Sequence, residues 1–244
     1  MKKLGYALLF LLSLVFFLYL NFPFERFIQA RLCQRGITAS ELEFKRFPPE
    51  VILKEVKLPG LPFRIETLTV KPHIPLKKFD YLARMCGGKV WGSFTYPVTE
   101  VVFHLQGIKP ETCYRTRVRL KGELSGEGFF RLKEKNLTAG QGSLKGEKLE
   151  LEGFSFGLFQ AELLSLGTFK GSYSVEGKNL IEFKGRGSGK DADYWLSGTV
   201  NYNPKKPTAS YVNLKITVLV KKEPLKGKRF TFKLRGLAEN LRLW

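Results

Sequence analysis

Hydrophobic and polar residues alternate in short segments along most of the chain after Gly36. Examples are ELEFKRF (41–47), VILKEVKL (51–58), EVVFHL (100–105) and YVNLKITVLV (211–220). Turn-forming sequences such as FPPE, LPGLP, GGK and NPKKP separate such segments. Because successive side chains of a strand point to opposite faces, this alternation predicts strands with one buried face. The sequence therefore predicts a mainly β protein, built as one elongated, curved, mostly antiparallel sheet with one or two short helices.

Two segments interrupt the alternation. Residues 23–35 predict a helix, because Pro23 suits a first helical turn and Gly36 a C-terminal stop. One face of this helix carries Phe24, Phe27, Ile28 and Leu32. That face either packs on the following domain or lies along a membrane interface. The second segment, PLKKFDYLARMCGG (75–88), predicts a short helix from Leu76 to Met85.

Glycines recur in a G-x-x-x-G pattern in the second half of the chain. The pairs are Gly122 and Gly126, Gly142 and Gly146, Gly167 and Gly171, and Gly185 and Gly189. Glycine weakens a strand interior, so we interpret these positions as strand ends and bends. A repeat near 20 residues would then correspond to one hairpin per unit.

The first 22 residues differ from the rest. Residues 4–22 carry no charge and are interrupted only by Gly5, Ser13 and Asn21. A helix of this length just spans a hydrocarbon core of about 30 Å. A cleaved signal peptide is disfavoured, because the run is long and no small-x-small cleavage site follows. We expect a transmembrane anchor with a short tail over 1–22 and a β-rich domain over 23–244. Lys2 and Lys3 favour a cytoplasmic N-terminus, which would place the domain in the periplasm.

The formal net charge of +19 suggests that the protein works in anionic surroundings. In YRTRVRLK (114–121), one parity holds Arg115, Arg117, Arg119 and Lys121, and the other holds Tyr114, Thr116, Val118 and Leu120. The cations are expected on the solvated face. They would pair with Glu147, Glu150 and Glu152 of a neighbouring strand, or contact anionic partners such as lipid headgroups. We favour the cross-strand ladder.

Candidate catalytic chemistry is sparse. KGRGSGKD (184–191) lacks both the first Gly and the final Ser or Thr of a phosphate-binding loop, so we interpret it as a flexible turn. His73 and His104 have no ligand at metal-binding spacing. Cys33, Cys86 and Cys113 show no paired spacing, so we expect buried free thiols, although one pair could form in an oxidising compartment. The sequence predicts no enzyme, cofactor or metal site, no small-molecule substrate and no nucleic-acid-binding module.

The opening FPFERFIQARLCQRGITASELEFKRFPPEVILKEVKL (22–58), after one Leu/Phe-rich anchor, resembles the type II secretion system protein N family and the related AsmA-type proteins. MCGGKVWGSF (85–94) is similar to their Gly-Gly-Lys strand entry. The resemblance implies an inner-membrane protein with a curved periplasmic sheet and an accessory role in protein secretion. Its partners would be membrane lipids and other secretion or envelope proteins. The alternative is an AsmA-like lipid-binding or lipid-transfer protein, which an uncovered apolar sheet face would favour.

Overall fold

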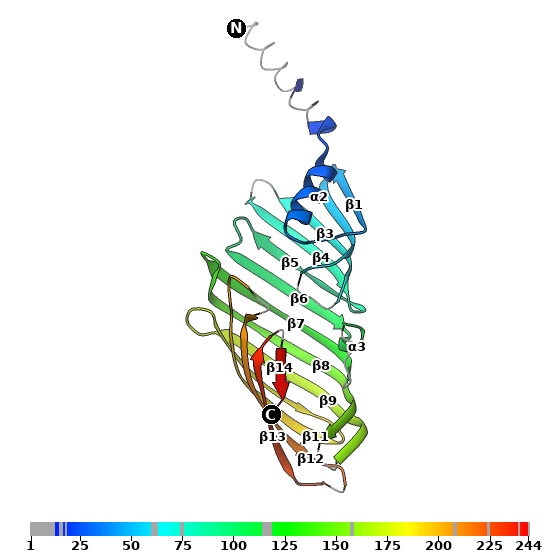
Figure 1. The fold of residues 1–244 in the computed structure, drawn as a ribbon, viewed down its shortest axis with the longest axis vertical. Helices are drawn as coiled ribbons and strands as arrows, with labels where there is room; N and C mark the ends of the chain where they lie inside the picture. The colour runs from blue at the N-terminus through cyan, green and yellow to red at the C-terminus, as the bar shows by residue number, and fades with distance from the viewer. Residues whose placement is uncertain are drawn as a thin grey trace.

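The computed structural model describes residues 13–14, 17, 19–59, 63–73, 76–113, 119–156, 159–206, 209–223, 225–238 and 240–243. Over this range the protein is one sheet of fourteen strands that follow one another in sequence order, as Figure 1 shows. Every neighbouring pair is antiparallel. The predicted single antiparallel sheet is confirmed.

The strands are β1 (Glu41–Arg46), β2 (Pro49–Val56), β3 (Ile65–His73), β4 (Lys78–Met85), β5 (Gly88–Thr95), β6 (Glu100–Ile108), β7 (Arg119–Lys133), β8 (Asn136–Phe156), β9 (Phe159–Val175), β10 (Leu180–Ser188), β11 (Ala192–Asn201), β12 (Tyr211–Val220), β13 (Arg229–Leu237) and β14 (Asn240–Leu243). Helix α2 (Phe24–Gln34) precedes the sheet, and the short helix α3 (Pro110–Cys113) joins β6 to β7.

The predicted helix over residues 23–35 is confirmed as α2, but the helix predicted from Leu76 to Met85 is wrong. That segment forms β4, which pairs with both β3 and β5. In β4, Phe79 and Tyr81 alternate with Lys78 and Asp80, so its polarity has the period of a strand. The ring of Phe79 stacks on that of Phe94 of β5 at 5.1 Å, a cross-strand contact that a helix could not make.

The glycine pattern was also misinterpreted in part. Gly126, Gly142, Gly171 and Gly185 lie inside strands rather than at turns, and β7, β8 and β9 run for 15, 21 and 17 residues. These strands are far longer than the usual five or six residues. Other glycines of the pattern accompany irregularities, because the register shifts near Gly122 and near Gly146.

One face of the sheet is apolar across thirteen strands. Paired residues share a face, and the pairing register links two unbroken rows that contain only apolar side chains and glycine. The first row runs Phe44, Val51, Val70, Tyr81, Gly92, Phe103, Gly128, Gly142, Tyr173, Phe183, Gly198, Leu214 and Leu234. The second runs Leu42, Leu53, Leu68, Ala83, Val90, Leu105, Gly126, Leu144, Gly171, Gly185, Leu196, Ile216 and Phe232. We call this side the apolar face and the opposite side the polar face.

The sheet curls at its C-terminal end, where β11 to β14 turn away from the plane of the earlier strands (Figure 1). Val212 and Phe232 of the apolar face are only 7% and 8% exposed, although no described helix lies near them. On the polar face of the same strands, Lys215 and Lys233 are exposed. The apolar face is therefore the inner side of the curl and the polar face its outer side.

A disulfide joins the turn after β4 to the end of α3. Cys86 and Cys113 are bonded with their Cα atoms 5.0 Å apart, while Cys33 is free and exposed. The expectation of free thiols is thus wrong for Cys86 and Cys113, which form the one pair left open as the alternative, and Cys33 is free as expected but exposed rather than buried. Sequence spacing could not reveal the bond, because the antiparallel arrangement of β4 to β7 brings together residues that are 27 positions apart.

The predicted anchor lies mostly on residues outside the described ranges. Residues 13–14, 17 and 19–21 of that segment are helical. Within the described part of the chain, no helix is both long enough and apolar enough to cross a membrane.

Candidate functional site

The central part of the apolar face has no helix over it in the described ranges. Helix α2 packs at the N-terminal end, where Leu32 contacts the core formed by Leu53, Val56, Ile65 and Ala83. Helix α3 lies at the ends of the strands rather than across the sheet (Figure 1). Between α2 and the C-terminal curl, the aromatic side chains of this face on β4 to β7 are only partly buried, namely Phe79, Tyr81, Phe94, Phe103 and Phe130. Phe103 and Phe130 also pack against a buried cluster of Leu137, Tyr173 and Ile181. We call this partly accessible surface, which no described helix covers, the apolar trough.

Aromatic rings line the trough because glycines on neighbouring strands leave room for them. The ring of Tyr173 lies across Gly128 and Gly142, where an added Cβ would come within 2.2 and 2.3 Å of its atoms. Tyr173 also stacks on Phe130 at 4.9 Å between ring centroids. Tyr194 covers Gly187 in the same way, with 2.1 Å to an added Cβ. Glycine inside these strands thus allows rings to lie flat on the sheet.

The tyrosine hydroxyls of this face do not break its apolar character. Tyr81 donates to the carbonyl oxygen of Val102 at 3.2 Å, and Tyr194 to that of Thr168 at 3.2 Å. Burial raises the pKa of Tyr173, and it raises that of Tyr194 to about 12. Both phenols therefore stay neutral at physiological pH, and their polar atoms are directed to backbone acceptors.

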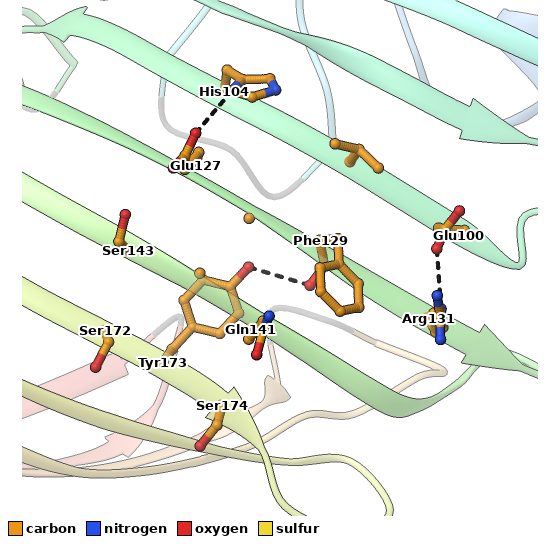
Figure 2. Close-up of a pocket in the computed structure, with 13 residues that line it drawn as sticks. Glu100, His104, Glu127, Phe129, Arg131, Gln141, Ser143, Ser172, Tyr173 and Ser174 are labelled. Atoms are coloured by element: carbon orange, nitrogen blue, oxygen red, sulfur yellow. Dashed lines mark hydrogen bonds and ion pairs between the residues drawn. The ribbon is translucent and has the colours of Figure 1, made fainter.

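The polar face carries an open depression of about 700 Å³ over β6 to β9, which Figure 2 shows from that side. Its charged side chains are paired with one another. His104 Nδ1 lies 3.5 Å from the Glu127 carboxylate, and Arg131 Nε lies 3.0 Å from that of Glu100. Val102 and Phe129 add apolar surface to the lining, and hydroxyl and amide groups come from Ser143, Ser172, Ser174 and Gln141. The depression is a mixed polar surface with its charges internally balanced.

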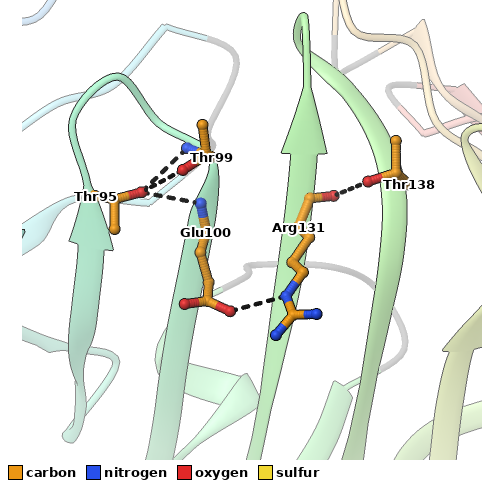
Figure 3. Close-up of polar contacts among 5 residues, drawn as sticks. All are labelled: Thr95, Thr99, Glu100, Arg131 and Thr138. Carbon is orange, nitrogen blue, oxygen red and sulfur yellow. Dashed lines mark hydrogen bonds and ion pairs between the residues drawn. The ribbon is translucent and has the colours of Figure 1, made fainter.

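Hydrogen bonds at the turn after β5 hold one edge of this depression in place (Figure 3). The Thr95 hydroxyl accepts from the backbone N–H of Thr99 at 3.2 Å and from that of Glu100 at 3.1 Å. On the next hairpin, Thr138 Oγ1 donates to the carbonyl oxygen of Arg131 at 3.3 Å. These bonds fix the ends of the strands that carry the Glu100–Arg131 pair.

The predicted cationic row is only partly described. Arg115 and Arg117 lie outside the described residues. Arg119 and Lys121 begin β7 and stand opposite Glu152 and Glu150 of β8. Lys121 Nζ is 3.1 Å from the Glu152 carboxylate. The strand that was expected to supply the carboxylates is therefore the neighbour of β7, and Lys121 forms an ion pair with it.

The four apolar residues of α2 separate into two groups. Phe24 packs on Phe44 of β1 with 4.6 Å between ring centroids, Leu32 packs on the core, and Ile28 is partly buried. Phe27 is 51% exposed, with the Arg31 guanidinium 5.5 Å from its ring centroid. Three of the residues thus face the domain, and Phe27 faces solvent.

Sequence reasoning missed the two rows of the apolar face as continuous features. Alternation indicates which residues share a face within one strand, but only the register shows that Phe103 lies opposite Gly128. In the described ranges, no group of three His, Cys, Asp or Glu side chains is arranged to hold a metal ion. Comparison with family models, curated proteins and solved structures finds no match to this chain.

Proposed function

We propose that this chain is a membrane-anchored protein of the bacterial envelope that binds the acyl chains of lipids along its apolar trough. The single observation that carries the proposal is the open, unbroken apolar face. None of the large side chains of its two rows is fully exposed, but most stay partly accessible, and contiguous accessible apolar surfaces usually mark an interaction site.

The dimensions suit an extended apolar ligand. Neighbouring strands lie about 4.8 Å apart, so fourteen strands form a sheet on the order of 60 Å long. The acyl chains of one leaflet extend over about 15 Å, half of a hydrocarbon core of about 30 Å. A chain could lie along the trough and contact the rings of Phe94, Phe103 and Phe130. These side chains offer apolar contact without hydrogen-bonding groups of their own.

The location is supported by two features. The uncharged run from 4 to 22, with Lys2 and Lys3 before it, has the composition of an anchor with a cytoplasmic N-terminus. The Cys86–Cys113 disulfide supports a domain in an oxidising compartment such as the periplasm. An inner-membrane protein with its sheet in the periplasm satisfies both features.

An accessory role in type II secretion was the first expectation from the sequence. That role would be favoured by a sheet whose apolar face is closed by its own helices and loops. In the described residues, α2 covers only the N-terminal end of the face and α3 lies at the strand ends. The open trough therefore favours the lipid-binding alternative.

Photocrosslinking in the intact membrane tests the proposal. Benzoylphenylalanine replaces Phe103 on the apolar face in one variant and its neighbour Val102 on the polar face in the control. Mass spectrometry after irradiation should find phospholipid adducts for the Phe103 variant and not for the Val102 variant. Adducts with a protein at position 103, without lipid, would overturn the proposal in favour of the secretion role. Equal lipid labelling at both positions would also overturn it, because it would show no preference for the trough.

A further inference from the structure

The polar face changes character between β8 and β13, where cations oppose one another across neighbouring strands. Lys145 of β8 pairs in register with Lys170 of β9, and Lys170 with Arg186 of β10. Further along the sheet, Lys215 of β12 stands opposite Lys233 of β13. Like charges directly opposite one another destabilise a sheet. We call these five residues the basic patch.

The basic patch has no acidic partner within the described residues. None of its five side chains takes part in an ion pair, whereas the neighbouring Lys184 is bound to Glu182 at 2.9 Å. All five are exposed. The excess is general in this part of the chain, because residues 136–237, from β8 to β13, contain 17 Lys and Arg against 9 Asp and Glu. An external anion would therefore relieve a repulsion that the fold leaves in place.

Exposed aromatic and aliphatic residues accompany the cations on this outer side of the curl. Trp195 lies opposite Arg186 in the same row and is 43% exposed. At one end of the same strands, Tyr211 stands opposite Leu237 in register, and both are exposed. Tryptophan and tyrosine are enriched at the headgroup level of membranes, where one part of the ring is apolar and another is hydrated.

We propose that the basic patch, with Trp195 among its cations, docks the C-terminal strands on a membrane surface rich in anionic lipid headgroups. Lysine and arginine near such a surface each contribute to attraction, and exposed aromatic residues insert at its interface. The convex side of the curl presents both groups outward, while the apolar face remains on the inner side. This docking uses the face opposite to the acyl-chain trough, so either surface could act without the other.

The test holds the full chain in nanodiscs of phosphatidylcholine and measures capture of separate vesicles that contain phosphatidylglycerol. The test variant is Lys170→Gln with Arg186→Gln. Its control is Arg84→Gln with Lys89→Gln, which removes two exposed cations that also oppose each other across strands. Both variants change the net charge equally and break no ion pair of the described residues.

We expect capture by the unchanged chain and by the control, and capture about 30-fold weaker for the test variant, equivalent to about 2 kcal/mol at about 1 kcal/mol per cation. Raising the salt concentration to 1 M, where the Debye length is about 3 Å, should abolish capture. Equal weakening in both variants would overturn the proposal, since net charge and not the patch would then be responsible. Binding to heparin or an acidic protein without capture of the vesicles would also overturn it.

A second measurement locates the contact. In a variant that keeps Trp195 as its sole tryptophan, vesicle capture should shift the fluorescence maximum to shorter wavelength, because the indole leaves water. An unchanged spectrum during capture would place the contact elsewhere and overturn the proposal. The lipid adducts at Phe103 should persist in the Lys170→Gln/Arg186→Gln variant. A failure of the trough and a failure of the patch can therefore be told apart.

Discussion

The polar faces of the N-terminal and C-terminal strands use charge in opposite ways. Over β1 to β3, Glu50 lies between two cations, with Lys45 Nζ at 3.5 Å and Lys71 Nζ at 3.4 Å. Over β8 to β10, Lys145, Lys170 and Arg186 succeed one another with no carboxylate in the row. The N-terminal strands are largely neutralised within the fold, although Arg84 and Lys89 are an exception. The C-terminal strands leave their charge available to something outside it.

The two regions also differ in what holds them together. The Cys86–Cys113 bond connects the β4–β5 turn with α3, and Leu32 of α2 packs on the core of β2 to β4. The C-terminal strands have no disulfide or helix among the described residues, and they pack by placing rings over glycine and by curling on their apolar side. One sheet thus combines an N-terminal part that is cross-linked and charge-balanced with a curled C-terminal part whose cations are unpaired.

The largest effect is expected from the disulfide, which braces the N-terminal part. Replacing Cys86 and Cys113 together by Ala should lower the free energy of unfolding by about 3–4 kcal/mol, because the bond closes a loop of nearly thirty residues in the unfolded chain. Urea unfolding of the full chain in detergent, followed by circular dichroism, measures this. Replacing the free Cys33 by Ser is the control and should leave the midpoint unchanged. An unchanged urea midpoint for the double variant would show that the disulfide does not stabilise the N-terminal strands relative to the C-terminal ones.

A smaller effect is expected from the glycines that support the C-terminal curl. Gly187→Ala places a Cβ 2.1 Å from the ring of Tyr194 and 2.6 Å from the carbonyl oxygen of Thr168. Ring and backbone would both have to move, so unfolding should become easier by about 1–3 kcal/mol. Ser197→Ala, at an exposed position on the polar face of β11, is the matched control. If Gly187→Ala were as stable as this control, the ring would not depend on the glycine beneath it.

Most strands could be predicted from the sequence, but their pairing register and the contacts between strands could not. The alternation in residues 211–220 is compatible only with a strand, and the structure places β12 over the same residues. The helix from Leu76 to Met85 was predicted because its segment appeared to interrupt the alternation, whereas in β4 Phe79 stacks across strands on Phe94. Gly142 and Gly187 were assigned to bends and a turn because a glycine in one strand does not show which ring on another strand covers it.

The candidate surfaces were even less accessible from the sequence. Lys145, Lys170 and Arg186 are separated by 25 and 16 residues, and nothing in their local sequence distinguishes them from other surface cations. They form a row only because the long strands β8 and β9 hold a particular register. The row at 114–121 was singled out because its cations recur at every second residue, yet Lys121, one of its two described cations, is paired with Glu152.

The smallest expected effects are the sharpest test of the contrast, because they should have opposite signs. Lys71→Gln removes a partner of Glu50, whose side chain is only 14% exposed, and should lower the free energy of unfolding by about 0.5–1 kcal/mol. Lys170→Gln relieves repulsion from Lys145 and Arg186, and should raise it by a few tenths of a kcal/mol. Both variants lose one positive charge, so a change that depended on net charge alone would have the same sign in each. Urea unfolding at low ionic strength measures the difference, and 1 M salt should reduce it because screening weakens exposed pairs most. Destabilisation by Lys170→Gln equal to that of Lys71→Gln would mean that a carboxylate reaches Lys170, and the unpaired character of the C-terminal strands would be lost.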